Sequence, residues 1–333
     1  MLIILLSIGA LSLSWLSVYF IKAYALKNLL DIPNQRSSHQ MPTPRGGGLG
    51  IALAFFAAVL ALFLGGSLDI TGFWVLTAGL LVAGIGFWDD HRPIPARWRF
   101  LVHMAAAAMG LCLIQGFPAL TIGGLRIESG LLGYALGVAY LVWLLNLFNF
   151  MDGIDGIAAS EAVFISGALA GFLSFVDYEL ALIAVALCFA SLGFLLWNWP
   201  RAKIFMGDVG SGFLGFVLGL LILMAGHRDP VYVYVGLILF AAFITDATVT
   251  LVNRYISGQR WYEAHCSHAY QHAAKRYGHL KVILVVWAIN LCWLLPLASV
   301  VFKYPAYALP GLLIAYLPLI YVTVRFEAGK TNA

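Results

Sequence analysis

The sequence predicts an all-α polytopic membrane protein with about 11 transmembrane helices, and three observations support this prediction. Of the 333 residues, 62% are hydrophobic and only 10% are charged, and the mean hydropathy of +0.92 is far above that of a soluble domain. Apolar stretches long enough to cross the hydrocarbon core recur along the whole chain. Basic residues fall almost entirely between alternate stretches.

The apolar stretches each have a length typical of a membrane-spanning helix. In the first, the cationic residues Lys22 and Lys27 follow the apolar run, which is the wrong order for a cleavable signal peptide. We therefore expect it to be the first membrane helix. The expected helices occupy residues 2–22, 49–66, 70–88, 101–117, 131–149, 157–175, 180–197, 211–226, 231–253, 281–302 and 306–325.

The basic residues predict the orientation of these helices. Of the 19 Lys and Arg residues, only Arg126, Arg228 and Lys303 fall on one side, and the other sixteen fall on the opposite side. The positive-inside rule places the N-terminus in the periplasm and the C-terminus in the cytoplasm. The cationic residues form no long runs, which excludes nucleic acid as a partner. Residues 1–333 are expected to form one membrane domain, with a small external hairpin within 118–130.

The first loop on the basic side combines polar residues with a run of glycines. It contains Asn34, Arg36 and Arg45, and glycines at 46–48 begin the next helix. Glycine and a helix N-terminus let backbone N–H groups approach an anion closely. An interfacial loop without a function would also explain its prolines, but we favour an anion-binding loop.

The second loop on this side opens with two adjacent carboxylates, Asp89 and Asp90, and continues to Arg97 and Arg99. Adjacent carboxylates near lipid repel each other and lose solvation, so they need a cation or a shared proton. Each arginine taken alone could be a counter-charge or a topology signal. Together, the acids and arginines suit a site for a metal and a phosphate.

The third loop contains two amides and two carboxylates in eleven residues. Asn146 and Asn149 would share one face of a helix, and so would Asp152 and Asp155. Such oxygen ligands suit Mg²⁺, which takes one or two protein ligands together with substrate phosphates. Four polar side chains at a membrane boundary are costly unless they have a function.

The fourth loop ends in a turn that leads into a new helix, with Lys203 five residues before Asp208. Asp208 could cap that helix. It could equally be a metal ligand that faces a phosphate held by the helix N-terminus. Both interpretations stay open from the sequence.

The last loop contains His265, His268 and His272, whose spacing would place them on one face of a helix. This spacing resembles that of a zinc site, but no fourth ligand of the HExxH type accompanies it. We favour hydrogen bonding to a nucleotide or a diphosphate.

Five motifs occur in order, and all fall on one predicted face: DIPNQRSSH with PTPRGGG, DDHRPIPARWRF, NLFNFMDGIDG, NWPRAKIFMGDVGSG and AHCSHAYQ. With them the sequence resembles the polyprenyl-phosphate N-acetylhexosamine-1-phosphate transferase superfamily over effectively the whole chain. The resemblance implies Asn149 and Asp208 as metal ligands and Asp89 and Asp90 as an essential catalytic acid pair. The substrate-binding residues expected from the motifs and the loops are Asn34, Arg36, Arg45, Arg99, Asn146, Asp152, Asp155, Lys203, His265 and His268.

The resemblance also implies a reaction and its partners. An enzyme of the bacterial inner membrane would transfer N-acetylhexosamine-1-phosphate from a UDP-sugar to undecaprenyl phosphate and release UMP. It would use Mg²⁺, for which Mn²⁺ can substitute, and the oligomeric state is left open between a monomer and a homodimer. The last motif departs from the commoner HxHH pattern, because Ala269-Tyr270-Gln271 follows His268. This resembles the O-antigen-initiating branch, whose donors are UDP-N-acetylated deoxyhexosamines.

Two other classes of protein would share some of these features. A secondary transporter would concentrate polar residues or helix breaks at mid-membrane depth, whereas here they cluster at one edge of the membrane. A polyprenyl diphosphate phosphatase would use the same metal but would need no nucleotide pocket.

Overall fold

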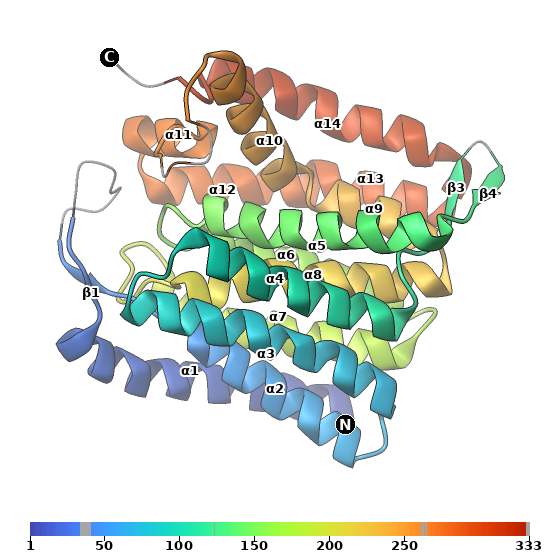
Figure 1. The fold of residues 1–333 in the computed structure, drawn as a ribbon, viewed down its shortest axis with the longest axis horizontal. Coiled ribbons are helices and arrows are strands. Elements are labelled where there is room, and N and C mark those ends of the chain that lie inside the picture. Colours follow the sequence, from blue (N-terminus) through green and yellow to red (C-terminus); the bar gives the residue numbers. More distant parts are fainter. Residues whose placement is uncertain (34–40, 123, 261–262, 264, 331–333) are drawn as a thin grey trace.

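Helices form nearly all of the chain in the computed structural model, which describes residues 1–33, 41–122, 124–260, 263 and 265–330 (Figure 1). A helix satisfies its backbone hydrogen bonds within its own segment, as a membrane interior requires. The helices are α1 (Leu2–Asn28), α2 (Gly48–Leu64), α3 (Ile70–His91), α4 (Ala96–Ile114), α5 (Gly130–Met151), α6 (Ile157–Leu173), α7 (Tyr178–Asn198), α8 (Asp208–Arg228), α9 (Val231–Leu239), α10 (Ala241–Ile256), α11 (Ala269–Tyr277), α12 (His279–Ile289), α13 (Leu295–Lys303) and α14 (Ala308–Arg325).

Short elements connect some of these helices. A π-helical turn, η1 (Asn290–Leu294), joins α12 to α13, and a 3₁₀ turn, η2 (Pro305–Tyr307), precedes α14. Two antiparallel hairpins pair β1 (Leu30–Asp31) with β2 (Thr43–Pro44), and β3 (Leu120–Ile122) with β4 (Leu125–Ile127). The hairpin predicted within 118–130 is therefore confirmed.

The all-α membrane class is confirmed, and the count of eleven spans is not. Among the described residues, eight helices are long and apolar enough to cross a membrane. The pair α9 and α10, bent by 68°, passes the same test and makes nine. Helices α2 and α6 are apolar but have only 17 residues each. All eleven expected stretches are helical, and α2 and α6 are the two that fall short of the length of a full span.

The helices run side by side between two ends of the molecule (Figure 1). Strand β1 and helix α11 lie at the left-hand end, and the β3–β4 hairpin lies at the right-hand end. Arg126 lies on β4, and Arg228 and Lys303 end α8 and α13. This arrangement fits the predicted alternation of the loops. Which end faces the cytoplasm stays a prediction.

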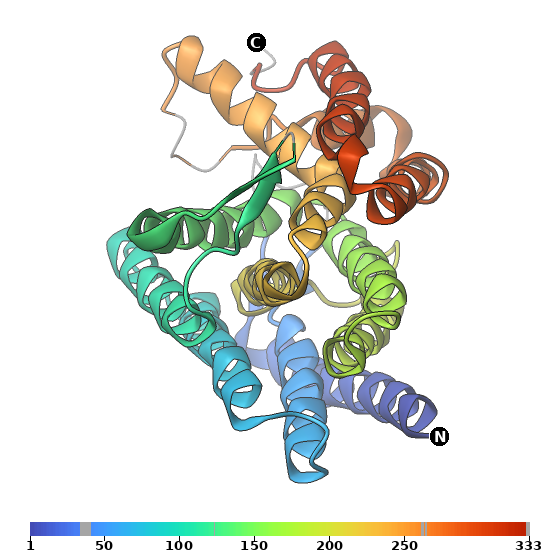
Figure 2. The same ribbon diagram turned by 90° about the vertical axis from the view of Figure 1, so that its right-hand side faces the viewer.

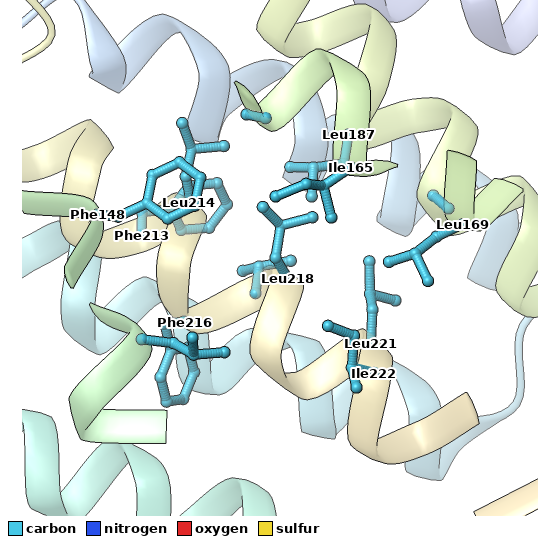
Figure 3. Close-up of a cluster of buried hydrophobic side chains, with 14 of the residues drawn as sticks. Phe148, Ile165, Leu169, Leu187, Phe213, Leu214, Phe216, Leu218, Leu221 and Ile222 are labelled. Carbon is cyan, nitrogen blue, oxygen red and sulfur yellow. The ribbon is translucent and has the colours of Figure 1, made fainter. Parts of the chain in front are cut away.

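Helix α8 lies at the centre of the bundle (Figure 2). A helix that is apolar around its whole circumference has to be buried, and 94% of the apolar stretch of α8 is buried. Figure 3 shows Phe213, Leu214 and Leu218 of α8 beside Phe148 of α5 and Ile165 of α6. Because the other helices pack around α8, its first turn is held in a fixed place.

Glycines let the N-terminus of α8 approach α2 and α3 closely. A Cβ at Gly48 of α2 would collide with the backbone of Gly210 in α8. A Cβ at Gly86 of α3 would lie 2.5 Å from the carbonyl oxygen of Asp208. Gly207, just before α8, has a φ of +76°, which favours glycine. The loops that precede and follow these helices therefore meet where α8 begins.

Candidate active site

A cavity of about 280 Å³ lies at the start of α8. Six residues predicted for the site line it: Arg45, Asp90, Asn149, Asp152, Asp155 and Asp208. The other lining residues are Asp31, Gly153, Ile154, Asn198, Phe205, Met206, Gly207, Ser211, Gln271 and His279. Loops far apart in the sequence thus gather carboxylates, amides and an arginine around one space, which suits a small charged ligand.

Asp90 caps helix α8. Its carboxylate accepts hydrogen bonds from the backbone N–H groups of Asp208 at 3.1 Å and Val209 at 3.2 Å. Arg45 Nη2 donates to the backbone carbonyl of Asp90 at 2.7 Å. A carboxylate at a helix N-terminus satisfies N–H groups that have no partner within the helix and interacts favourably with the helix dipole. Asp90 therefore fixes the first turn of α8, and with it the position of Asp208.

The alternative that Asp208 itself caps the helix is wrong. Asp208 is the first residue of α8, and the helix has no cap from a side chain of its own. The Asp208 carboxylate instead accepts a hydrogen bond from Arg99 Nη1 at 2.7 Å, and the same nitrogen donates to Asp89 at 2.7 Å. Asp89 also accepts from the N–H of Ile94 at 2.6 Å. Arg99 therefore bridges two carboxylates at the edge of the cavity.

Asp152 is the most strongly perturbed acid in this loop. Helix α5 ends at Met151, so Asp152 and Asp155 lie beyond it, and the predicted helical face for this pair is wrong. Burial raises the pKa of the Asp152 carboxyl well above its usual range, and the negative charges of Asp208, Asp90 and Asp155 raise it further. The clustered carboxyls therefore disfavour one another's ionisation, and a bound cation would relieve that repulsion.

His279 and Asn198 hold the loop after α5 in place. His279 Nδ1 lies 3.3 Å from a carboxylate oxygen of Asp155, and the N–H of Ala202 donates to Asp155 at 3.2 Å. Asn198 Oδ1 accepts from the N–H of Gly156 at 2.9 Å, and its Nδ2 donates to Ile204 at 2.9 Å. These bonds join the third and fourth loops into one wall of the cavity.

The donor atoms of the cavity fit Mg²⁺. Among the described residues, no three His, Cys, Asp or Glu side chains are grouped so that they could hold a metal alone. Mg²⁺ does not need such a group, because it takes one or two carboxylates and completes its shell with waters and substrate phosphates. The Asn149 side chain interacts with Asp208, and Asp152 lines the same cavity beside them. Asn149 and Asp208 are suitable ligands.

The glycines after Arg45 have a different role from the one predicted. Their N–H groups do not face an anion, since Gly47 donates to the carbonyl of Phe205 at 2.9 Å and Gly48 to that of Met206 at 2.8 Å. The loop is thus fastened to the segment before α8. Arg45 itself lines the cavity, as predicted.

Asp89 and Arg99 do not line the cavity themselves, although Arg99 is bonded to Asp208 at its edge. Two further predicted residues, Lys203 and Asn146, also lie outside it. The Lys203 ammonium lies 5.5 Å from the centre of the Trp197 ring, and Asn146 donates to the Val142 carbonyl of its own helix at 2.7 Å. Neither residue lines the cavity. Asn34 and Arg36 lie outside the described residues, so their roles stay predictions.

The expected helical face of histidines is wrong. Helix α11 begins at Ala269, and His268 before it has an extended backbone, so His265 and His268 do not share a helix with His272. His268 Nδ1 lies 3.2 Å from the buried carboxylate of Asp246. Burial, together with the nearby His268 and Arg254, lowers the pKa of His265 to about 3. Neither His265 nor His268 lines the cavity.

Five polar cavity residues were missed from the sequence: Asp31, Asn198, Ser211, Gln271 and His279. Asp31, Asn198 and His279 share one signal, because each is a polar residue at the boundary of an apolar stretch on the basic side. Ser211 and Gln271 lie within the quoted motifs, but neither was assigned a role, since serine and glutamine are common on helix surfaces. Their place depends on how α8 and α11 pack.

Comparisons with known proteins agree with this geometry. The family described as Glycosyl transferase family 4 matches residues 72–226. The chain is 29% identical to the "Probable undecaprenyl-phosphate N-acetylglucosaminyl 1-phosphate transferase" of Bacillus subtilis (strain 168), over 94% of this chain and 88% of that protein. It is 31% identical to the decaprenyl-phosphate N-acetylglucosaminephosphotransferase of Mycobacterium leprae, over 77% and 72% of the two chains.

A third relative acts on a different sugar. The phospho-N-acetylmuramoyl-pentapeptide-transferase of Lactiplantibacillus plantarum is 30% identical, over 75% of this chain and 81% of that protein. The family match to residues 72–226 spans the loops that carry Asp90, Asp152 and Asp208. The chain therefore belongs to glycosyl transferase family 4, in the superfamily of polyprenyl-phosphate N-acetylhexosamine-1-phosphate transferases, and is a sugar-phosphate transferase.

Proposed function

We propose that the cavity transfers N-acetylhexosamine-1-phosphate from a UDP-sugar to undecaprenyl phosphate in the bacterial inner membrane. An oxygen of the lipid phosphate attacks the sugar-bearing phosphorus of the donor. The bond from that phosphorus to the bridging oxygen breaks, UMP leaves, and the product is undecaprenyl-diphospho-sugar. This reaction would begin the synthesis of O-antigen or a related envelope polysaccharide.

The observation that carries the proposal is the convergence of Asn149, Asp152, Asp155 and Asp208 on one cavity at a single end of the helix bundle. The diphosphate of the donor and the carboxylates of the site are both negatively charged. A divalent cation between them is therefore required. Mg²⁺ held by Asn149 and Asp208 would neutralise charge on the diphosphate and favour departure of UMP.

The protein's own residues would position the reactants. Asp90 holds the first turn of α8, and Arg45 and Arg99 are the cations available to phosphate at the edge of the site. A phosphate monoester with a second pKa of about 6 is largely ionised at neutral pH. Removal of its last proton by Asp90 or Asp89 would therefore contribute less to the rate than positioning does. A two-step route through an aspartyl-phosphate is the competing mechanism.

The position of the cavity disfavours a transporter. Transporters bind substrate near mid-membrane depth, whereas this cavity lies where α3 and α5 end and α8 begins. A polyprenyl diphosphate phosphatase remains a chemical alternative, because it would use the same metal. The product that is released distinguishes a phosphatase from a sugar-phosphate transferase.

The proposal is tested with purified protein, undecaprenyl phosphate and a panel of UDP-N-acetylhexosamines, followed by mass analysis of the lipid and of the nucleotide. We expect a lipid product that is heavier by one N-acetylhexosamine phosphate, together with UMP. Release of inorganic phosphate without UMP would support a phosphatase. Absence of turnover with every donor would return a transporter to consideration.

The same panel tests the choice of donor. We expect a higher kcat/KM with a 6-deoxy N-acetylhexosamine donor than with UDP-GlcNAc, because the Ala269-Tyr270-Gln271 sequence departs from the commoner motif and a pocket without a partner for the 6-hydroxyl does not favour it. Gln271 is the residue of this segment that lines the cavity. Equal or higher kcat/KM with UDP-GlcNAc would contradict the assignment of the donor and leave the reaction type intact.

A further inference from the structure

A second, apolar groove lies on the other side of α11 from the catalytic cavity. It has a volume of about 360 Å³ and is lined mainly by residues of α10, α11, α12 and α14, among them Phe243, Ala273, Val285 and Leu319. Met151 at the end of α5 and Ile157 at the start of α6 also line it. Val285 is 59% exposed, so the groove opens on the outer surface of the bundle. In a membrane, that surface faces lipid tails.

The groove offers almost no free polar group. Its one carboxylate, Asp246, accepts hydrogen bonds from the N–H groups of Ala269 at 3.0 Å and Tyr270 at 2.8 Å. Thr250 also donates to Asp246, at 3.1 Å. The groove can therefore hold a hydrocarbon chain but offers nothing to bind a polar ligand along its length.

A basic cavity continues the groove at one end. This cavity has a volume of about 740 Å³, and Tyr277 and Phe326 line both spaces. Its charged lining residues are the cations Lys275, Arg276 and Arg325 and one acid, Glu327. Lys281 lies at the rim of the groove itself. An apolar space and a cationic space thus meet at two shared aromatic side chains.

The positive charge of this cavity is largely uncompensated. In the described part of the chain, none of Lys275, Arg276 and Arg325 forms an ion pair with a carboxylate, and Glu327 is paired with Lys330 at 3.3 Å. The Arg276 guanidinium lies over the Tyr277 ring at 5.3 Å. Clusters of cations next to a membrane helix attract anionic lipid head groups.

We propose that the groove and the basic cavity together form a binding site for an anionic membrane phospholipid. One acyl chain lies in the groove, and the phosphate of the head group lies among Lys275, Arg276 and Arg325. The bound lipid would pack against α11, the helix that carries Gln271 on the wall of the catalytic cavity.

The site is separate from the site for the acceptor. The Tyr270 hydroxyl donates to the carbonyl of Phe150 at 2.9 Å, and the Tyr270 and Gln271 side chains lie against Gly153, so that a Cβ there would collide with both. These contacts lie between the groove and the loop that carries Asp152 and Asp155. Met151 and Ile157, which flank that loop, line the groove, but among the residues that the structure describes the groove and the catalytic cavity share no lining residue. A phosphate held at Arg276 and Arg325 is therefore on the far side of α11 from Asp208.

The test is native mass spectrometry of the full chain in detergent with phosphatidylglycerol or with phosphatidylcholine of the same acyl chains. We expect one phosphatidylglycerol to be retained more tightly than phosphatidylcholine. Each cation near an anionic lipid contributes about fivefold in affinity, so the double variant Arg276→Gln/Arg325→Gln should lose phosphatidylglycerol affinity by roughly 25-fold. The matched control is Lys27→Gln/Arg92→Gln, which removes two exposed cations from α1 and the end of α3 and should leave the affinity unchanged.

A second variant tests the groove. Ala273→Phe fills part of it and should weaken retention of either phospholipid while the protein still melts cooperatively. Equal retention of both phospholipids by the wild type, or the same loss in the control and in the double variant, would overturn the proposal. Displacement of phosphatidylglycerol by undecaprenyl phosphate, one molecule for one, would also overturn it, because the groove would then belong to the acceptor. None of these readouts depends on turnover.

Discussion

Two carboxylates beside the first turn of α8 have different roles. Asp90 accepts two backbone hydrogen bonds from the helix, so its negative charge is used to hold α8. Asp208 accepts none from the backbone, and its carboxylate points to Arg99. The acid that the sequence offered as a helix cap thus points to Arg99 and not to the helix backbone, and its neighbour in space, Asp90, supplies the cap.

Asp208→Asn separates these roles at the level of one residue. Asparagine keeps the shape of the side chain but removes a negative ligand from Mg²⁺. Losing such charge stabilisation costs about a hundredfold or more in rate. We therefore expect a stable, membrane-inserted protein whose kcat is lower by about a hundredfold or more and whose Mg²⁺ requirement is higher.

The control for Asp208→Asn is the same substitution at a true cap. Asp69 caps α3 by accepting from the N–H of Gly72 at 2.6 Å, and asparagine caps about as well as aspartate. Asp69→Asn should therefore leave both melting temperature and kcat near those of the wild type. A fully active Asp208→Asn enzyme with unchanged Mg²⁺ dependence would rule out the metal role and turn attention to Asp152 or Asp155.

At the scale of helices, the site depends on how closely α3 approaches α8. Gly86→Ala would place a Cβ 2.5 Å from the carbonyl oxygen of Asp208, and backbone cannot give way as a side chain can. Overpacking of this kind costs about 1–3 kcal/mol. We expect a lower melting temperature and a lower kcat, since the first turn of α8 has to move.

Gly84, two residues earlier on the same helix, provides a matched control. A Cβ at Gly84 would meet nothing within 4 Å, and alanine is a better helix former than glycine by up to about 1 kcal/mol. Gly84→Ala should leave kcat unchanged and keep or raise the melting temperature. Equal effects of the two substitutions would show that the approach of α3 to α8 does not position the site.

The elements were predictable from the sequence because the length of an apolar stretch is a local signal. Helices formed in all eleven expected places, and the hairpin around Gly124 formed as expected. What could not be predicted are contacts between distant residues, such as the cap that joins Asp90 to Asp208, 118 positions later in the chain. The end of α5 at Met151 and the extended backbone of His268 also depend on packing around α8 and α11.

The site residues also divide into those that the sequence predicts and those whose position depends on packing. Motifs placed Asp152, Asp155 and Asn149 in the cavity because each lies at the boundary of an apolar stretch. Lys203 also lies in such a motif, yet its ammonium lies over Trp197 instead. A long, flexible side chain can point away from its motif, and only the packed structure decides its direction.

For the whole molecule, the charge asymmetry predicts which end faces the cytoplasm. In a protein without its natural cysteines, Ser257→Cys, in the exposed turn after α10, should react only with reagents that reach the cytoplasm. Glu128→Cys, after β4, should react with impermeant reagents added outside intact cells. Labelling of Ser257→Cys from outside would place the catalytic cavity on the wrong side for a cytoplasmic nucleotide-sugar.

The most direct test of the whole account follows one phosphorus atom. A UDP-N-acetylhexosamine labelled with ³²P at the sugar-bearing phosphate is incubated with undecaprenyl phosphate and the purified protein. The account predicts that the label appears in the lipid, that an equal amount of unlabelled UMP is released, and that EDTA stops both until Mg²⁺ or Mn²⁺ is restored. Label left in released UDP, or turned into inorganic phosphate, would contradict transfer of a sugar-1-phosphate.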